Sequence, residues 1–276
     1  MSSASLPFQL TKTLACALYE MQAISKVTPL YLADTTLNAK YNNSPTVLPD
    51  NTPKIAYFGI GVNGFKNLND SNLSAPFVPS SKDLDLYTPL PFRIVPIDND
   101  LTPAERANYR MRVMKVVGGV QYWCYYLKVL SFINNNVQII QTNVTTGIET
   151  VLTDLDTTNL NPTPTVTSAE GVVETNQKIS VALTAGMQVT GVEVIEAINV
   201  LYGGNLLKAS ISEIGIYTGD DKTVVMSDGA GGTFNGIESM FTSLAYHYTC
   251  LPVSFSTPSR VENFALRLAS ASAFLI

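Results

Sequence analysis

The chain has 276 residues, of which 46% are apolar and only 14% are charged, and its formal net charge is −5 at pH 7. This length provides a sizeable core and excludes the mini-proteins, while the high apolar and low charged content excludes a disordered chain or a general polyanion binder. No run of about 18 uninterrupted apolar residues occurs, so we expect no membrane span and no membrane partner. The first residues lack the basic and apolar regions of a secretory signal, which predicts an unprocessed chain made in a cytosol.

The first predicted elements are a helix, a strand and a long loop. The helix is expected over residues 8–25, where apolar residues recur at helical spacing. These residues are Leu10, Leu14, Leu18 and Met21. A strongly apolar run over 54–61 predicts a short buried strand. Residues 62–96 follow with many Asn, Ser and Pro and little periodicity, which predicts a long insertion loop for binding or assembly.

A hairpin is the clearest predicted element in the middle of the chain. Two β-prone runs, Tyr109 to Val117 and Val120 to Phe132, flank Gly118-Gly119, a dipeptide that tolerates the positive φ of a two-residue turn. The second run is apolar and aromatic on both faces, which indicates a strand buried between a core and another layer. Just before the hairpin, a capping box from Thr102 to Glu105 predicts a short helix.

The second half of the chain predicts more strands and a second helix. Strands are expected at 137–144 and 178–183, separated by a protruding loop over 153–177. A second capping box, Thr190 to Glu193, opens a helix that ends before Gly203-Gly204.

Beyond this helix we expect a hairpin, a long strand and a third helix. The hairpin arms are 207–217 and 223–226, the long strand is 244–256, and the helix is 258–268. The whole pattern is that of a single structural domain over 1–276 in the α+β, β-rich class. It predicts an antiparallel sheet or β-sandwich with an N-terminal helix, one or two packed helices and long polar loops.

Two patterns that could carry catalysis are better explained as structural. Residues Gly59 to Gly64 read GxGxxG after a strand, but no helix is predicted behind them to hold a pyrophosphate. His247 is the single histidine, and no GxSxG motif presents a serine for it to activate. We therefore expect a glycine turn in the first case and a structural histidine in the second.

Acidic and cysteine residues likewise give no metal-site pattern. Three aspartate pairs occur, Asp83/Asp85, Asp98/Asp100 and Asp154/Asp156. None has the glycine and glutamate spacing of a calcium-binding EF-hand loop, so solvated turn residues are expected. The three cysteines are Cys16, Cys124 and Cys250. Their spacing predicts buried free thiols. We therefore predict no catalytic, cofactor-binding or metal-binding residue, no cofactor, and a protein that is not an enzyme.

The closest approach to a basic cluster lies around the predicted hairpin, and it consists of Arg106, Arg110, Arg112 and Lys115. Together with Tyr109 and Trp123, these residues could form a nucleic-acid surface. The negative net charge and the lack of a second basic stretch argue against that partner. Ion pairing to a neighbouring subunit is at least as well supported.

Residues 209–217 carry a motif that resembles a known family. The segment Ala-Ser-Ile-Ser-Glu-Ile-Gly-Ile-Tyr, which contains Glu213 and Tyr217, is similar to the (I/F)-x-E-(I/L)-G-(I/L)-Y strand of phage tail-collar fibre N-terminal domains and related neck and baseplate proteins. In that family a turn and another strand follow, and residues 219–225 fit this pattern. The family also opens with a helix and a strand that ends in a small-residue turn, to which 8–21 and 55–64 are similar.

The resemblance implies a structural component of a bacteriophage virion without catalysis. No collagen-like or repetitive shaft follows the motif, which favours a single-module neck, collar or tail-ring protein that joins head and tail or anchors fibres. The implied partners are further copies of the chain in a homo-oligomeric ring and portal or connector, tail, fibre or collar proteins. The implied location is the virion, assembled in the host bacterial cytoplasm. The alternative is a receptor- or glycan-binding adhesin module of a phage tail or baseplate that uses the Tyr and Asn residues of 68–91.

The composition is consistent with large subunit interfaces, in which aromatic and neutral polar side chains contribute more than exposed charges. The candidate interface residues are Arg110, Arg112, Trp123, Tyr125, Glu213, Tyr217, Phe274, Leu275 and Ile276. The last three form an apolar segment that is expected either to dock on a neighbour or to fold back on the core of its own chain.

Overall fold

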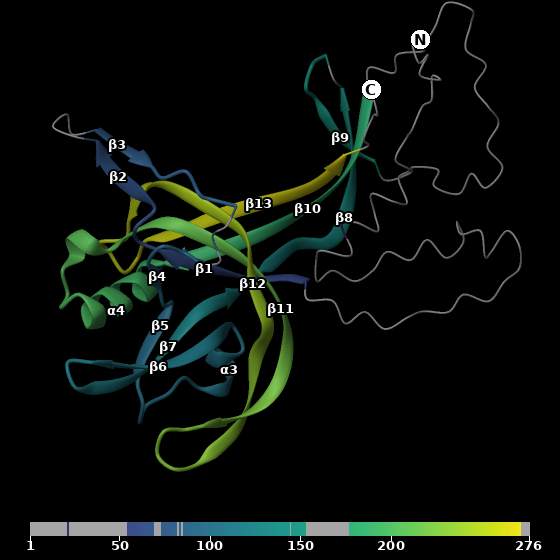
Figure 1. Ribbon diagram of the computed structural model, residues 1–276. Coiled ribbons are helices and arrows are strands. Elements are labelled where there is room, and N and C mark those ends of the chain that lie inside the picture. The colour runs from purple at the N-terminus through teal and green to yellow at the C-terminus, as the bar shows by residue number, and fades with distance from the viewer. Residues whose placement is uncertain are drawn as a thin grey trace, which may run out of the picture. The chain divides into compact units, whose positions relative to one another are not determined.

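The protein is described by a computed structural model in which the strand pairs of the main sheet are antiparallel (Figure 1). The described residues are Met21, 54–68, 73–81, 83, 85–143, 145–152 and 177–271. The predicted β-rich α+β class is confirmed. The predicted helix over 8–25 lies outside the described residues except for Met21, which is helical and buried, and the predicted loop lies outside them over 153–176.

The chain forms two compact units. Unit 1 consists of Met1–Asn51, Phe132–Ala185 and Leu266–Ile276, and unit 2 consists of Thr52–Ser131 and Gly186–Ala265. The prediction of one structural domain over 1–276 stays a prediction.

Unit 2 contains a seven-stranded antiparallel sheet. Its strands are β1 (Lys54–Gly61), β4 (Pro89–Leu90), β5 (Arg93–Pro96), β6 (Tyr109–Val117), β7 (Val120–Val129), β11 (Ser210–Ser227) and β12 (Thr233–Ser254). They follow the order β12-β11-β1-β7-β5, with β4 paired to β1 and β6 paired to β7. The predicted hairpin around Gly118-Gly119 is confirmed as β6 and β7, and both glycines have positive φ.

A separate two-stranded sheet and the sheet of unit 1 complete the described strands. The small sheet pairs β2 (Phe65–Leu68) with β3 (Leu73–Pro76). The other sheet has the order β13-β10-β8-β9. Its strands are β8 (Ser131–Asn143), β9 (Glu149–Leu152), β10 (Gln177–Thr190) and β13 (Val261–Ala271). Within unit 1, Val181, Leu183 and Leu268 are buried.

Both predicted capping boxes open helices. Thr102 caps α3 (Pro103–Arg106) and Thr190 caps α4 (Gly191–Leu201), each with reciprocal bonds to the glutamate three residues on. A short 3-10 helix, η2 (Leu206–Lys208), follows α4. Helix α4 packs beside β5 and buries Val194, Ala197 and Ile198, so its apolar stripe is the side that holds it to unit 2 (Figure 1).

The core of unit 2 lies beside the paired centres of β1 and β11. Phe58 and Ile60 of β1 pair with Ile216 and Ile214 of β11, and all four side chains are buried. Residues opposite each other on antiparallel strands project from the same face, so these four form one apolar layer. Phe92 packs edge-on against Phe58 with ring centroids 5.1 Å apart.

The predicted hairpin around Gly219–Asp221 is wrong, because β11 runs without interruption from Ser210 to Ser227. Asp220 and Asp221 pair with Met240 and Ser239 of β12, and the Asp221 carboxylate binds a guanidinium from β6. The turn lies further on, over 228–232, where an aspartate and two glycines with positive φ reverse the chain. Long-range pairing thus overrides the local turn composition.

Two more predictions need correction. The third helix expected over 258–268 is strand β13, in which half-buried and exposed positions alternate with period two from Val261 to Arg267. The insertion loop expected over 62–96 contains the four short strands β2 to β5. Their segments are two to four residues long, too short to produce a periodic signal.

Replacing Ile198 by Ala is expected to lower the free energy of unfolding by about 2–5 kcal/mol, because the fully buried side chain would leave a cavity under α4. Urea denaturation measures the change. Val192→Ala, on the exposed side of the same helix, is the control and should change it by less than about 0.5 kcal/mol. Equal effects of the two substitutions would contradict this packing of α4.

Candidate functional site

The residues of the Glu-Ile-Gly-Ile-Tyr motif alternate between the two faces of β11. In β11 the residues Ile214 and Ile216 face the apolar layer, so Glu213, Gly215 and Tyr217 share the opposite face. That face carries the chain segment 62–88, which is held by both polar side chains of the motif. The motif pairs with β1 through Gly61↔Glu213, so the two segments that carry the family resemblance are adjacent strands.

Glu213 is the centre of this arrangement, and 0% of its surface is exposed. Its Oε1 accepts from the backbone N–H of Asn63 at 2.7 Å and of Thr88 at 3.3 Å, and its Oε2 accepts from the N–H of Tyr87 at 2.7 Å. A buried carboxylate is stable only when its oxygens are satisfied in this way. One side chain therefore fixes both ends of the segment 62–88 on β11.

His247 links the same carboxylate to a second acid. Its Nε2 lies 3.4 Å from Glu213 Oε2, and its Nδ1 lies 2.9 Å from Asp83 Oδ2. The Tyr87 ring contacts the imidazole edge-on, with ring centroids 4.7 Å apart. Every one of these contacts holds the segment 62–88 against β11 and β12, which agrees with the structural role predicted for His247.

Glycine positions explain the remaining spacing of the motif. A Cβ on Gly215 would lie 2.7 Å from the Tyr217 ring, and one on Gly59 would lie 3.1 Å from it. The ring can therefore lie flat across both strands only because both positions lack a side chain. In this position the Tyr217 hydroxyl donates to Asp85 Oδ1 at 2.8 Å, and burial raises the pKa of Tyr217 so that it remains a donor.

The same need for close approach explains the glycine motif after β1. A Cβ on Gly64 would lie 2.1 Å from the backbone oxygen of Ser212, whose hydroxyl accepts from the Gly64 N–H at 2.8 Å. The residues behind Gly64 form β2 rather than a helix. The GxGxxG sequence is thus a turn packed on β11, as predicted, and the helix N-terminus of a dinucleotide site does not follow it.

The arginines of the predicted basic cluster are neutralised inside unit 2. Arg110 forms a two-pronged ion pair with Asp221, at 2.9 and 3.1 Å, and Arg112 binds Asp100 at 2.7 Å. The Arg112 guanidinium lies 3.4 Å from the centre of the Trp123 ring. Ion pairing within the chain therefore replaces the pairing to a neighbouring subunit that we considered from the sequence.

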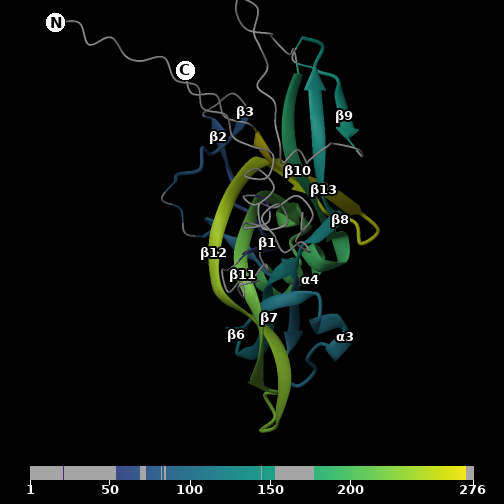
Figure 2. The ribbon, with the colours of Figure 1, turned by 90° about the vertical axis from the view of Figure 1, so that its right-hand side faces the viewer.

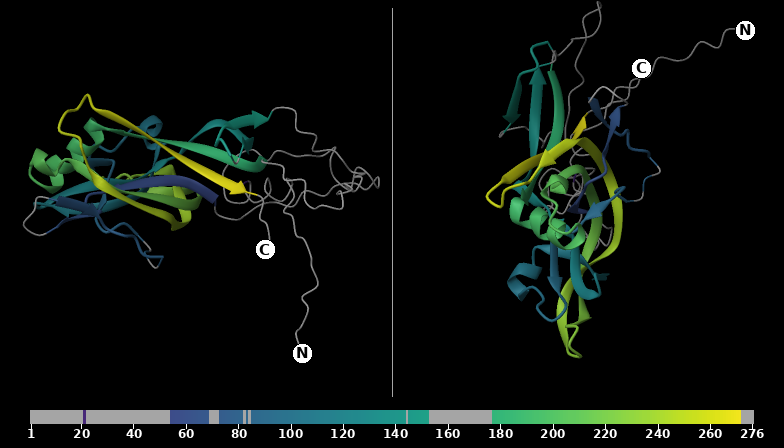
Figure 3. Two further views of the ribbon diagram at one scale, coloured as in Figure 1. Left: turned by 90° about the horizontal axis from the view of Figure 1, so that it is seen from above. Right: turned by 90° about the vertical axis from the view of Figure 1, so that its left-hand side faces the viewer.

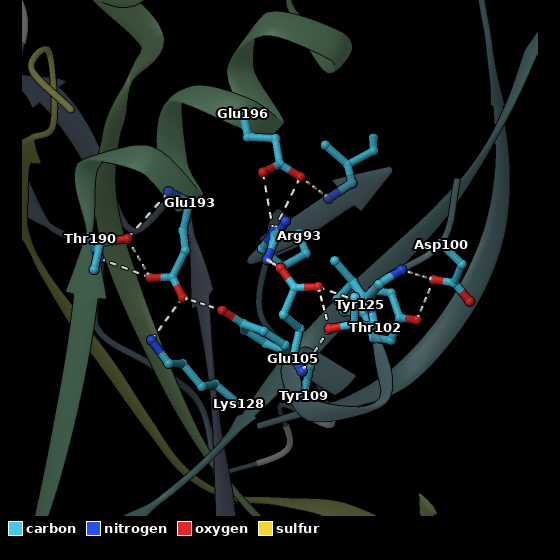
Figure 4. A network of polar contacts seen from close by, with 12 residues as sticks. Arg93, Asp100, Thr102, Glu105, Tyr109, Tyr125, Lys128, Thr190, Glu193 and Glu196 are labelled. Atoms are coloured by element: carbon cyan, nitrogen blue, oxygen red, sulfur yellow. Dashed lines mark hydrogen bonds and ion pairs between the residues drawn. The ribbon is translucent and has the colours of Figure 1, made fainter. Parts of the chain in front are cut away.

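Asp100 and Glu193 organise two further parts of this network (Figure 4). Asp100 accepts from the Tyr125 hydroxyl at 2.6 Å. Glu193 of α4 accepts from Tyr109 at 2.8 Å and from Lys128 at 2.7 Å. These bonds tie α4 to β6 and β7, and burial raises the pKa of both tyrosines, which remain neutral donors.

Most sequence-predicted interface residues lie in the interior of unit 2. Arg110, Glu213, Tyr125 and Tyr217 are buried, and Trp123 is half-buried. The Arg112 side chain is 5% exposed. Such side chains offer little surface to a partner, and their observed role is internal. Phe274, Leu275 and Ile276 lie outside the described residues.

Two hairpin arms carry exposed apolar residues that the sequence reasoning missed. We define the short arm as the outer part of β6–β7, residues 113–123, and the long arm as the outer part of β11–β12, residues 220–240. The exposed apolar side chains of the two arms are Val113, Met114, Val116, Val120, Val225 and Ile237. The signal in the sequence was the apolar and aromatic content of both faces of the second run, which we interpreted as a strand buried between a core and something else.

The long arm extends beyond the short arm of the same unit. Figures 1 and 2 show the ends of β11 and β12 curving past β6, β7 and α3 to a projecting tip, and the right-hand view of Figure 3 shows the same tip from the opposite side. The arm is attached at its base by Glu238 of β12, whose carboxylate accepts from the N–H groups of Met111 and Arg112 of β6. Met111 has φ of 56°, a conformation that turns both amides toward one carboxylate.

The described residues contain free cysteines, no metal-ligand cluster and no membrane-spanning helix. No group of three or more His, Cys, Asp and Glu side chains could hold a metal ion there, and no described helix is long and apolar enough to cross a membrane. Cys124 is a buried free thiol as predicted, and burial raises its pKa to about 11. Cys250 is free and half-buried, and Cys16 lies outside the described residues.

Comparison with known proteins identifies a family but no characterised relative. The model of a family of unknown function, DUF7208, matches residues 2–252. No curated protein and no solved structure matches the chain.

Replacing Glu213 by Gln is expected to lower the free energy of unfolding by about 3–5 kcal/mol, because an amide NH₂ would meet N–H donors in a buried site. Amide hydrogen exchange at Asn63, Tyr87 and Thr88 should accelerate in parallel. Glu262→Gln, which breaks an exposed ion pair with Arg260, is the control and should cost less than about 1 kcal/mol. Unchanged exchange at the three amides would disprove the role of Glu213 as the anchor of 62–88.

The lowered pKa of Asp83 predicts that the protein loses stability in acid. The Ser80 N–H and His247 hold the pKa of Asp83 below its ordinary value of 3.8. Its contribution to stability is therefore fully present above pH 3.8 and is lost as the pH falls through the lower folded-state pKa. Urea midpoints measured from pH 5 downward should fall less steeply for Asp83→Asn than for the unmodified protein below pH 3.8. Parallel pH profiles would show that Asp83 makes no such contribution.

Proposed function

Since the chain belongs to DUF7208, a family of unknown function, we propose its role from the resemblance carried by residues 209–217 together with its own geometry: it is a structural component of a bacteriophage virion. It is a neck, collar or tail-ring protein that forms a homo-oligomeric ring, joins head and tail or anchors fibres, and performs no catalysis. Its partners are further copies of itself and portal or connector, tail, fibre or collar proteins. It is assembled in the host bacterial cytoplasm and resides in the virion.

The observation that carries this proposal is the pair of arms with exposed apolar side chains. Val116 on the short arm is 60% exposed and Val225 on the long arm is 72% exposed. On the long arm Val225 and Ile237 are diagonal neighbours on one face, because Val225 pairs with Asn235 and Thr223 pairs with Ile237. Extended hairpins with apolar faces gain stability by packing on another subunit, since an isolated two-stranded ribbon is marginal in water.

The internal distribution of charge supports the same role. The cationic groups beside the short arm are paired within the chain, as Arg110 is with Asp221 and Arg112 with Asp100. Apart from Lys115 on the short arm and the charged residues at the base of the long arm, such as Lys222, the arms expose apolar and neutral polar side chains, which are typical of interface centres. When one surface of a subunit binds a different surface of the next copy, the copies form a ring if the repeated rotation between neighbours adds up to a full turn.

Replacing both Val116 and Val120 by Asp is expected to weaken self-association by at least tenfold for each substitution, because a charge would be buried in the contact without a partner. The mass of the unmodified protein and of the variant by light scattering over a range of concentrations measures the change. The control is Val192→Asp, an equally exposed valine on α4, which should keep the assembled mass.

Two results would contradict the proposal. One is an unmodified protein that stays monomeric at every concentration and is absent from purified virions by mass spectrometry. The other is a double variant that assembles as well as the unmodified protein and as the Val192→Asp control, which would remove the short arm from the interface.

A further inference from the structure

A cavity of about 270 Å³ opens between the segment 85–89 and the base of the short arm, entirely within unit 2. Its volume is just below the range of roughly 300–1,000 Å³ found for small-molecule sites. It opens to solvent on one side, so a ligand has a path into it. The strands β1, β6, β7 and β11 each contribute to its wall.

One polar atom in this wall has no partner in the fold. The hydroxyl of Tyr126 on β7 is buried, and no hydrogen bond satisfies it. The Lys115 ammonium and the Cys124 thiol both lie near this hydroxyl and affect its pKa, which burial raises, but neither meets it with the distance and angle of a full hydrogen bond. A buried hydroxyl without a hydrogen bond destabilises the folded chain. This cost is recovered if a ligand in the cavity supplies the missing bond.

Two opposite charges stand at the rim. The Lys115 ammonium lies 5.1 Å from the centre of the Tyr126 ring and forms no ion pair within the described part of the chain. Asp85 uses Oδ1 to accept from Tyr217 and from the N–H of Leu86, and its Oδ2 accepts no bond from the described residues. The cavity therefore offers a donor cation, an acceptor anion and a hydroxyl that can do both.

The rest of the wall is apolar. Ile60, Leu86, Pro89, Met111 and Val113 line it, together with the flat ring of Tyr217 above Gly59. Apolar lining exceeds polar lining, which is the usual balance in small-molecule sites with a few placed polar groups.

These features select one class of ligand. Asp85 and Lys115 together leave the wall without net charge, so it favours neither an anion nor a cation, and a purely apolar molecule would leave the Tyr126 hydroxyl unpaired. The ligand is therefore neutral, about one ring in size, with hydroxyls that donate and accept along one edge and C–H groups on its faces. We propose that this cavity binds a pyranose sugar unit, which would add a saccharide-binding site to the assembly role.

Binding of methyl pyranosides to the full chain, followed by saturation-transfer NMR, tests the proposal. A panel of hexosides, 6-deoxyhexosides and N-acetylhexosaminides should contain at least one that binds. Tyr126→Phe should weaken that binding by about five- to tenfold, the loss of one hydrogen bond. Tyr122→Phe on the same strand, outside the cavity wall, is the matched control and should bind as the unmodified protein does.

The same variants give a readout independent of any sugar. Because the Tyr126 hydroxyl has no partner in the fold, Tyr126→Phe should unfold at the same or a higher temperature than the unmodified protein. A lower unfolding temperature would mean that the hydroxyl is already paired, which would overturn the proposal. A glycan array run in parallel separates the two sources of the ligand: binding to free pyranosides alone indicates a free sugar, and stronger binding to longer chains indicates a unit of a polysaccharide.

Three results would overturn the saccharide site. They are an absence of binding across both the pyranoside panel and the array, equal binding by Tyr126→Phe and the unmodified protein, and saturation transfer that maps to residues away from the cavity. None of these depends on whether the chain assembles, so the outcome is distinct from the light-scattering test of the arms.

Discussion

The fold of unit 2 depends on the buried carboxylate of Glu213. The described residues of segment 62–88 lie on the face of β11 opposite the apolar layer. Three of its backbone amides and one imidazole converge on Glu213, which converts an irregular segment into a fixed wall. The Tyr217 contact to Asp85 and the cavity beside 85–89 exist only because this segment is held in place.

The sequence was most informative where local chemistry determines local structure. The capping boxes at Thr102 and Thr190 and the Gly118-Gly119 turn each combine residue type and spacing in a way that few other conformations satisfy, and all three predictions are confirmed. Predictions failed where contacts with residues far away in the sequence determine the local conformation. The Gly219–Asp221 segment is composed like a turn, yet pairing with β12 and the ion pair to Arg110 keep it extended.

The candidate site was harder to predict for the same reason. Glu213 and Tyr217 were selected through a motif, but as interface residues, because nothing in the sequence shows that their partners are backbone amides and acids more than a hundred residues away. Asp100 was assigned to a solvated turn and Asp221 to a hairpin turn, and both assignments are wrong, because the sequence does not show that each carboxylate lies beside an arginine. Which charges are neutralised, and which apolar residues remain exposed, is a property of the packed chain.

The two hydrogen bonds that Glu238 accepts from β6 would also limit the ways in which copies meet in the proposed ring. A strand with unpaired amides is a template on which further strands can add without end. At Met111 and Arg112 the two amides are already occupied by a carboxylate, so another backbone would have to displace a charged acceptor to pair there. Growth by sideways sheet extension is disfavoured at this edge, so in the proposed ring the contacts made here would use side chains, whose geometry can stop at a fixed number of subunits.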